Sequence, residues 1–151
     1  MSHDLRIITN SPSETEELGF KLGRLLKAKG KGMALLYGDL GAGKTVFVKG
    51  VASAFGIAKR DIGSASFVIA AEYETSPPFY HIDLYRVERE EDIEALGIWE
   101  YMDSEGVAIV EWAERLAVPS AEIYEDAVKV RIDHIDENSR EIIIEGVESL
   151  E

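Results

Sequence analysis

The chain has 151 residues, of which 46% are hydrophobic, and this length and composition predict one domain with a substantial core. It contains no cysteine, which excludes disulfides, thiolate metal sites and cysteine nucleophiles. The net charge is −13 and is concentrated late in the chain, because residues 1–83 carry +1 and residues 84–151 carry −14. Since nucleic-acid-binding surfaces are usually basic, this distribution argues against independent, tight binding of nucleic acid.

The sequence gives no sign of a membrane or export segment. No apolar run approaches the roughly 20 residues of a membrane-spanning helix. The first six residues lack the basic and apolar regions of a signal peptide. We therefore expect a cytoplasmic protein without membrane contact, forming a single domain over residues 1–151.

The first predicted element is an amphipathic helix. Ser13–Glu16 has the S/T-x-x-E pattern of a capping box, and Gly30 is placed to end the helix. Between them, leucines recur at helical spacing at Leu18, Leu22, Leu25 and Leu26. The same segment carries a basic cluster, formed by Lys21, Arg24, Lys27, Lys29 and Lys31. Two interpretations of this cluster stay open: a solvated helix face, or a surface that contacts a partner or RNA.

The strongest signal in the chain follows the apolar run Met33–Tyr37, which is typical of a buried parallel strand. Residues 38–45 read GDLGAGKT and match the phosphate-binding pattern G-x-x-x-x-G-K-[ST]. Glycines allow successive backbone N–H groups to point inward at a phosphate, without a Cβ in the way. The pattern assigns Lys44 to the β and γ phosphates and the Thr45 hydroxyl to Mg²⁺. The predicted nucleotide-binding residues of this loop are Asp39, Leu40, Gly41, Ala42, Gly43, Lys44, Thr45 and Val46.

The segment after the loop supports this interpretation. Apolar residues at helical spacing run from Val46 to Phe55, and Gly56 is placed as a helix-ending glycine. The order of strand, loop and helix argues against a chance glycine-rich turn, and the helix N-terminus would add its dipole to the phosphate site.

The rest of the chain alternates between predicted strands and helices. We expect a loop over Ile57–Ser66, a short extended piece at Phe67–Ala70, strands at Phe79–Ile82 and Gly106–Val110, an acidic helix at Glu88–Leu96 ended by Gly97, and a hairpin of Ala127–Asp133 with Glu141–Glu145. The predicted fold is a compact α/β domain of the P-loop NTPase class. Its central sheet should be mainly parallel and flanked by helices, with a C-terminal antiparallel hairpin at one edge.

Hydrolysis needs acidic residues beside the loop, to hold Mg²⁺ and to position the attacking water. In α/β sheets such residues lie at the carboxyl ends of strands. Asp83 and Glu111 each follow a predicted strand, so we assign both, with Lys44, to catalysis, and both, with Thr45, to the metal. Which of the two holds the metal and which positions water stays open. The alternative for either is a charged strand end that faces solvent.

Three further residues are candidates with two interpretations each. Ser66, beside Ser64 in a polar loop, either senses the γ-phosphate or bonds its own backbone as a turn residue. Trp112, directly after Glu111, either stacks on a base or a partner residue or packs at the rim of the domain. His81 is expected to be a packed strand histidine rather than a catalyst.

With these motifs in place, the chain resembles the TsaE (YjeE) family, the small bacterial ATPases of tRNA threonylcarbamoyladenosine (t6A) synthesis. The resemblance covers nearly the whole chain. Beyond the phosphate loop it rests on His81–Arg86 (HIDLYR), Glu94–Ile98 (EALGI), Glu100 with Tyr101, and Val110–Glu114 (VEWAE). The combination of D-L-Y-R and E-W-x-E segments in so short a chain is specific. Two departures are Ser64–Phe67 (SASF) where the family reads S-P-T-F, and Ala113 where it reads E-W-P-E. Both remove a proline that would stiffen the loop.

The resemblance implies that Lys44 and Thr45 serve ATP and Mg²⁺, that Asp83 and Glu111 serve the metal and hydrolysis, and that Trp112 lies near the site. It implies partners as well. TsaE-like proteins bind the TsaD–TsaB pair, which carries out the transfer, and ATP hydrolysis is thought to reset that pair. Contact with tRNA would then be only indirect, through the complex, and adenine specificity follows from the resemblance alone.

Two other functions remain alternatives. A small-molecule or nucleotide kinase shares the phosphate loop, but such kinases need several arginines around donor and acceptor, and only Arg86 and Arg89 follow near the predicted site. A nucleotide-gated assembly factor would bind ATP without hydrolysing it. A GTPase is disfavoured because neither Asn10 nor Asn138, the two asparagines of the chain, begins an N-K-x-D guanine motif.

Overall fold

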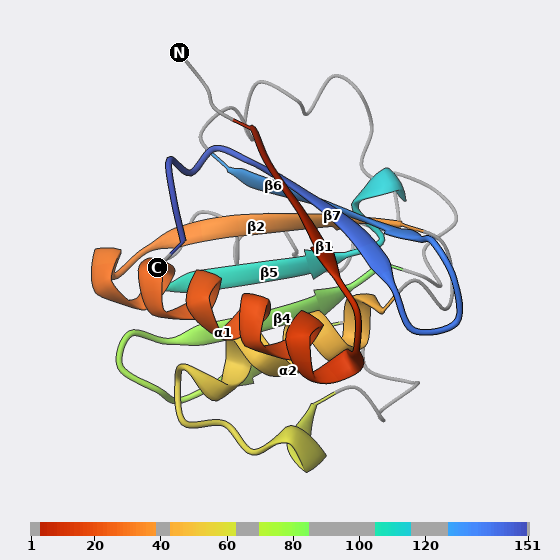
Figure 1. Ribbon diagram of the computed structural model, residues 1–151. Coiled ribbons are helices and arrows are strands. Elements are labelled where there is room, and N and C mark those ends of the chain that lie inside the picture. Colours follow the sequence, from red (N-terminus) through yellow and green to blue (C-terminus); the bar gives the residue numbers. More distant parts are fainter. Residues whose placement is uncertain (1–3, 39–42, 63–69, 85–104, 116–126, 151) are drawn as a thin grey trace.

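The computed structural model describes residues 4–38, 43–62, 70–84, 105–115 and 127–150. Within them, seven strands form one sheet in the order β1-β7-β6-β2-β5-β4-β3 (Figure 1). The strands are β1 (Asp4–Thr9), β2 (Gly32–Tyr37), β3 (Ala70–Tyr73), β4 (Phe79–Asp83), β5 (Val107–Glu111), β6 (Val128–His134) and β7 (Arg140–Glu145). The helices are α1 (Pro12–Lys29) and α2 (Lys44–Ser53), with short 3₁₀ turns η1 (Lys59–Asp61) and η2 (Ala113–Arg115).

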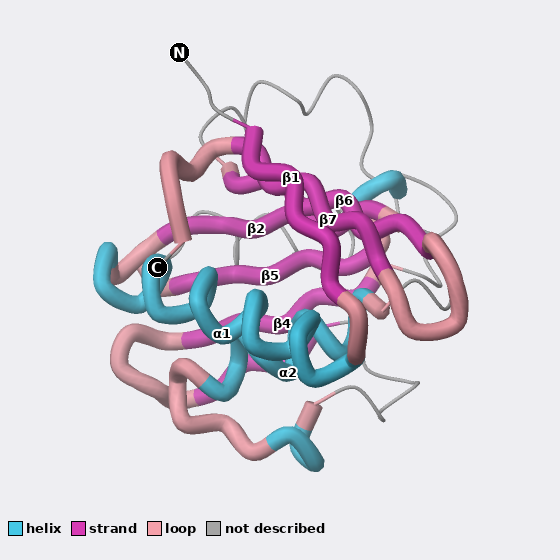
Figure 2. The backbone as a smooth tube through the Cα atoms, in the orientation of Figure 1, coloured by secondary structure: helices cyan, strands magenta, loops and turns pink. Residues whose placement is uncertain are grey.

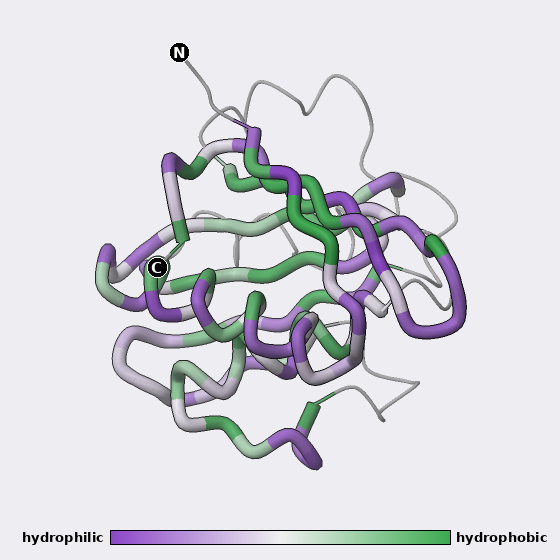
Figure 3. The backbone as a smooth tube through the Cα atoms, in the orientation of Figure 1, coloured by the Kyte–Doolittle hydropathy of each residue, from purple (hydrophilic) through white to green (hydrophobic). Residues whose placement is uncertain are grey.

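The centre of the sheet is parallel, as the sequence predicts. Strand β2 pairs in parallel with both β5 and β6, and β5 pairs in parallel with β4. Every residue of β5 and the first four residues of β4 are buried, and Figure 3 shows the apolar character of β5. Parallel strands covered on both faces need such continuous apolar runs.

Antiparallel strands lie at both edges of the sheet. The C-terminal hairpin of β6 and β7 is confirmed, but β1 adds a further antiparallel strand outside β7. At the opposite edge β3 pairs antiparallel with β4. Strand β3 begins at Ala70, where the predicted extended piece ends, and residues 67–69 lie outside the described residues. The predicted acidic helix at Glu88–Leu96 and its ending at Gly97 also lie outside them.

The N-cap of helix α1 lies two residues before the predicted one. Its N-cap is Ser11 rather than Ser13, because the Ser11 hydroxyl accepts from the Glu14 N–H at 3.1 Å and Pro12 occupies the first helical position. The Glu14 carboxylate in turn accepts from the Asn10 N–H at 2.9 Å. The helix is therefore capped at Ser11 and not at the predicted Ser13–Glu16 box, whereas the predicted end at Gly30 is confirmed by its left-handed conformation, with φ of 79°.

The two helices lie side by side over one face of the sheet (Figure 2). Their backbones approach closely at three glycines, Gly19 and Gly23 of α1 and Gly50 of α2. A Cβ on Gly19 would lie 2.2 Å from the Phe47 carbonyl oxygen, and one on Gly50 would lie 2.0 Å from that of Glu16. This contact fixes α2 against the N-terminal helix.

Helix α2 ends as the sequence predicts, with a glycine turn. The Gly56 N–H donates to Ser53 at 3.0 Å, and the Ile57 N–H donates to Ala52 at 3.2 Å. These two bonds, with Gly56 at φ of 81°, make a Schellman ending.

Among the described residues, no helix is long and apolar enough to span a membrane.

Candidate functional site

The candidate site lies at the carboxyl ends of the central parallel strands. Strand register places Glu111, the last residue of β5, between Leu36 of β2 and Asp83, the last residue of β4. The phosphate loop leaves β2 at this same edge and leads into α2. The edge is where α/β sheets bind ligands, since loops and strand ends meet there.

The N-terminus of α2 has the features of an anion site. Gly43 occupies the N-cap position in a left-handed conformation, with φ of 101° and no side-chain cap. Thr45, in the first turn, is exposed. A helix start that no side chain caps leaves N–H groups and the positive end of the helix dipole for a phosphate.

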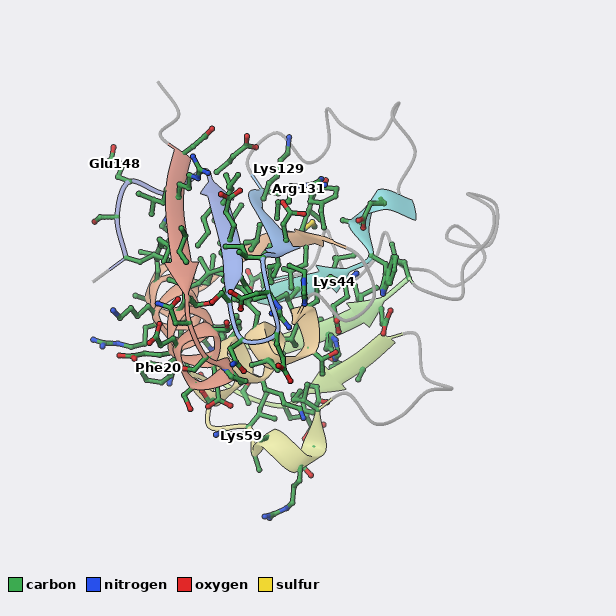
Figure 4. All side chains as sticks on the ribbon, turned by 45° about the vertical axis from the view of Figure 1, so that its right-hand side comes forward. Phe20, Lys44, Lys59, Lys129, Arg131 and Glu148 are labelled. Atoms are coloured by element: carbon green, nitrogen blue, oxygen red, sulfur yellow. The ribbon has the colours of Figure 1, made fainter. Side chains whose placement is uncertain are left out.

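Lys44 is buried in this structure, with only 5% of its surface exposed. Its Nζ donates to the carbonyl oxygen of Gly38, the first residue of the loop. The same Nζ lies 3.2 Å from the centre of the Trp112 ring, a cation–π contact. In Figure 4 Lys44 lies well inside the molecule, while Phe20, Lys59 and Glu148 lie at its margins. The sequence-predicted lysine and tryptophan are thus brought together.

Glu111 is the most enclosed acidic residue of the site, with 3% exposure. Its Oε1 accepts from the Thr45 hydroxyl at 3.4 Å, and its Oε2 lies 2.6 Å from His81 Nε2. A carboxylate taken out of water needs such partners, because an unpaired buried charge is costly. The structure therefore brings Thr45 and Glu111 together, as the metal assignment requires, and adds His81.

Asp83 ends β4, partly buried and in register with Glu111. The backbone beside it is fixed, because the Leu84 N–H donates to the Glu111 carbonyl oxygen at 3.1 Å. The donor set of Thr45 hydroxyl and two carboxylates consists of hard oxygen ligands, the kind that Mg²⁺ prefers. In the part of the chain that the structure describes, no cluster of three or more His, Cys, Asp or Glu could hold a metal unaided.

Several predicted site residues lie outside the described residues. These are the loop residues Asp39, Leu40, Gly41 and Ala42, and the hydroxyl candidates Ser64 and Ser66. Arg86 lies outside them as well.

Two polar residues of the site were missed or undervalued by the sequence analysis. Glu114, in η2, accepts from the Gly38 N–H at 2.8 Å and so ties the start of the phosphate loop to the segment after Glu111. The sequence signal was its place in the E-W-x-E segment. His81 is a packed strand histidine, as expected, but its partner is a site residue.

The pKa of Tyr37, the last residue of β2, is raised by its surroundings. Burial raises the pKa of the Tyr37 phenol above its ordinary value, and the negative charges of Glu114 and Glu145 raise it further. Tyr37 is therefore a neutral phenol at the strand end that leads into the loop.

A pocket adjoins the start of α2. It is lined by Pro12, Thr15, Gly43, Val46, Glu137, Asn138 and Arg140, from the α1 N-terminus, the loop, α2 and the β6–β7 turn. Arg140 holds that turn in place, donating to the carbonyl oxygens of Asp136 at 2.8 Å and Ser139 at 2.9 Å.

Comparison with known proteins decides the family. Residues 9–142 match the family described as "Threonylcarbamoyl adenosine biosynthesis protein TsaE". The chain belongs to the TsaE family. The resemblance seen in the sequence motifs is thereby confirmed.

TsaE relatives match over most of their length. A protein from Treponema pallidum named tRNA threonylcarbamoyladenosine biosynthesis protein TsaE is 35% identical over 140 residues, covering 93% of this chain and 99% of its own. The Bacillus subtilis protein of the same name is 38% identical, covering 92% of this chain and 84% of its own. The crystal structure of Bacillus subtilis YdiB has a TM-score of 0.74 at 32% identity, covering 98% of this chain and 88% of that one. The predicted TsaE-type P-loop fold is confirmed.

Proposed function

We propose that this chain is an ATP-binding and ATP-hydrolysing accessory protein of t6A synthesis in tRNA. The observation that carries the proposal is the meeting of Lys44, Thr45 and Glu111 at the uncapped start of α2, in a chain of the TsaE family. The names of its relatives supply the pathway.

In the proposed complex the phosphates lie on the α2 N-terminus and the loop. Lys44 leaves the Gly38 carbonyl oxygen and the Trp112 ring to contact the β and γ phosphates. The nucleoside end extends toward the pocket beside Gly43 and Val46, where the β6–β7 turn and the α1 N-terminus form the walls. Adenine as the base is inferred from family membership.

Mg²⁺, when bound, would neutralise the charge that develops on the phosphates. Thr45, Asp83 and Glu111 would hold the ion and its water. One of the two carboxylates contacts the metal, and the other orients the attacking water. A buried Glu111, fixed on two sides, suits either role because its geometry is set before the nucleotide arrives.

We further propose that the chain acts with a TsaD–TsaB pair and resets it by hydrolysis. Turnover by the chain alone is then slow, since groups supplied by a partner can contribute several orders of magnitude in P-loop enzymes. The net charge of −13 agrees with contact to tRNA only through the complex. The cytoplasmic location remains a prediction from the sequence.

The experiment is a measurement of Mg²⁺-dependent ATP turnover by the purified chain, alone and with TsaD and TsaB, with Lys44→Ala as the blank. We expect slow turnover alone that rises with the pair. Turnover that ignores the pair would break the link to that complex, and a phosphorylated product from a nucleoside and nucleotide panel would identify a kinase instead. If Glu111→Gln still binds ATP and supports repeated cycles of tRNA modification, the chain is a non-hydrolysing assembly factor.

A further inference from the structure

His81 and Glu111 form a buried contact within the site. His81 of β4 lies opposite Ile109 of β5, two residues before Glu111, so that both side chains stand at neighbouring places on adjacent strands. His81 is 8% exposed and Glu111 is 3% exposed. A hydrogen bond of 2.6 Å joins His81 Nε2 and Glu111 Oε2.

We propose that His81 is the positioning residue for Glu111. The inference rests on the proposed function, in which Glu111 serves the metal or the attacking water. The imidazole holds Oε2 and thereby leaves Oε1 as the oxygen presented to Thr45 and to the phosphate side of the loop.

The chemistry of the two groups sets the direction of this bond. An ionised carboxylate only accepts hydrogen bonds, so the ring nitrogen that faces it carries a proton and donates. A donor on one oxygen fixes the plane of the carboxylate as well as its position. A histidine that donates to a carboxylate of the site therefore limits the rotation of Glu111 about its last torsion.

The contact also explains how Glu111 is kept within the sheet. Among the described residues, no buried side-chain polar atom lacks a hydrogen-bond partner. An apolar residue at position 81 would leave Oε2 without its donor and would favour a turn of the carboxylate toward Thr45 and the loop. The predicted consequence is that the Glu111 carboxylate still contacts groups of the site but adopts several orientations.

The test compares two amides of different length at position 81. The side-chain nitrogen of His81→Gln reaches about as far as Nε2, whereas that of His81→Asn is one methylene shorter and cannot reach Glu111. We expect His81→Gln to keep kcat for ATP within about threefold of the wild type. We expect His81→Asn to lower kcat by about 10- to 100-fold, with KM for ATP changed less than about twofold. KM should change less than kcat because Lys44 and the loop contact the phosphates directly and Glu111 itself is retained in this variant.

A second measurement does not depend on activity. The chain has three histidines, at positions 3, 81 and 134, so ¹⁵N-histidine NMR can resolve each ring. We expect one slowly exchanging Nε2–H signal, displaced by its carboxylate partner. It should move in Glu111→Gln and stay in place in His134→Gln, which alters an exposed histidine of β6.

Each outcome has one meaning. A wild type without Lys44-dependent turnover would reject the proposed function, whatever the NMR shows. If the wild type does turn over ATP, either of two results would overturn the positioning role. One is a kcat in His81→Asn equal to that of the wild type, and the other is an equal loss of kcat in the Gln and Asn variants. An Nε2–H signal that is unchanged in Glu111→Gln would overturn it as well, even if the position-81 variants fail to fold.

Discussion

Lys44 Nζ lies 3.2 Å from the centre of the Trp112 ring, and the same nitrogen donates to the Gly38 carbonyl oxygen. Trp112 adopts φ of 60°, which is uncommon for a residue with a side chain of this size. Such outliers tend to mark functional sites. In this structure the lysine that we propose to bind phosphate is held by the Gly38 carbonyl oxygen and the Trp112 ring.

This contact predicts a fluorescence signal for nucleotide binding. A Trp99→Phe variant leaves Trp112 as the single tryptophan of the chain. Saturating Mg-ATP should change its emission, because the ammonium moves from the ring to the phosphates. Adding Lys44→Ala should shift the nucleotide-free emission in the same direction, since it also removes the charge. Nucleotide-free emission that is unchanged by Lys44→Ala would show that the lysine does not affect the ring.

The bond between Glu114 and the Gly38 N–H predicts a role in nucleotide affinity. Glu114→Ala should raise KM for ATP by about three- to tenfold, because the start of the loop loses a hydrogen bond worth about 0.7–1.4 kcal/mol. Glu114→Gln should keep most of the affinity, since an amide oxygen accepts the same bond. Glu148→Ala, an exposed acid far from Lys44 in Figure 4, is the charge control. Equal KM values for all three variants would show that the contact does not order the loop.

The sequence was sufficient for the parts of the site that depend on chain order. The pattern of residues 38–45 identified the loop, and the buried runs before Asp83 and Glu111 identified two parallel strand ends. Parallel strands end at the same edge of a sheet. That both residues lie at this edge can therefore be predicted without knowing the strand register.

The parts that the sequence did not predict depend on lateral neighbours. Strand β1 alternates charged and apolar residues, and it is stabilised by β7, more than 100 residues away, a pairing that no local pattern reveals. The contact of His81 with Glu111 needs the register of β4 against β5. Gly19 and Gly50 each destabilise the helix in which they lie. Their place in the sequence is explained only by the close approach of the two helix backbones.

That helix contact makes a prediction about stability. Gly→Ala in a helix normally stabilises by up to about 1 kcal/mol, but Gly50→Ala should destabilise the fold by about 1–3 kcal/mol, because its methyl group would meet the α1 backbone. Chemical denaturation measures the change, and Glu17→Ala on the exposed side of α1 is the control for an alanine at a helix surface. A Gly50→Ala protein as stable as the wild type would mean that the helices can separate at low cost.

The raised pKa of Tyr37 predicts a loss of stability in alkali. Below about pH 10 the phenol keeps its proton in both the folded and the unfolded chain. Above it the unfolded chain releases the proton first, so the free energy of unfolding falls until the folded pKa is passed. Tyr37→Phe should make this fall shallower. Glu145→Gln should lower the pKa of Tyr37, read from phenolate absorbance against a Tyr37→Phe blank, whereas Glu148→Gln should leave it unchanged. If the wild type, Glu145→Gln and Glu148→Gln give identical phenolate titrations, Glu145 does not contribute to the raised pKa of Tyr37.

The two strand-end carboxylates predict a separation of binding from turnover. Asp83→Asn and Glu111→Gln should each lower ATP turnover by about 10²- to 10⁴-fold while the protein still binds ATP through Lys44 and the α2 N-terminus. A Mg²⁺ titration of ATP binding then assigns the roles: the metal-holding residue is the one whose replacement makes affinity independent of Mg²⁺, and the water-positioning residue leaves that dependence intact. Asp4→Asn, an exposed acid at the start of β1, should change neither quantity. Full turnover in either site variant would remove that residue from the mechanism. If that residue is Glu111, the positioning role of His81 would be removed with it.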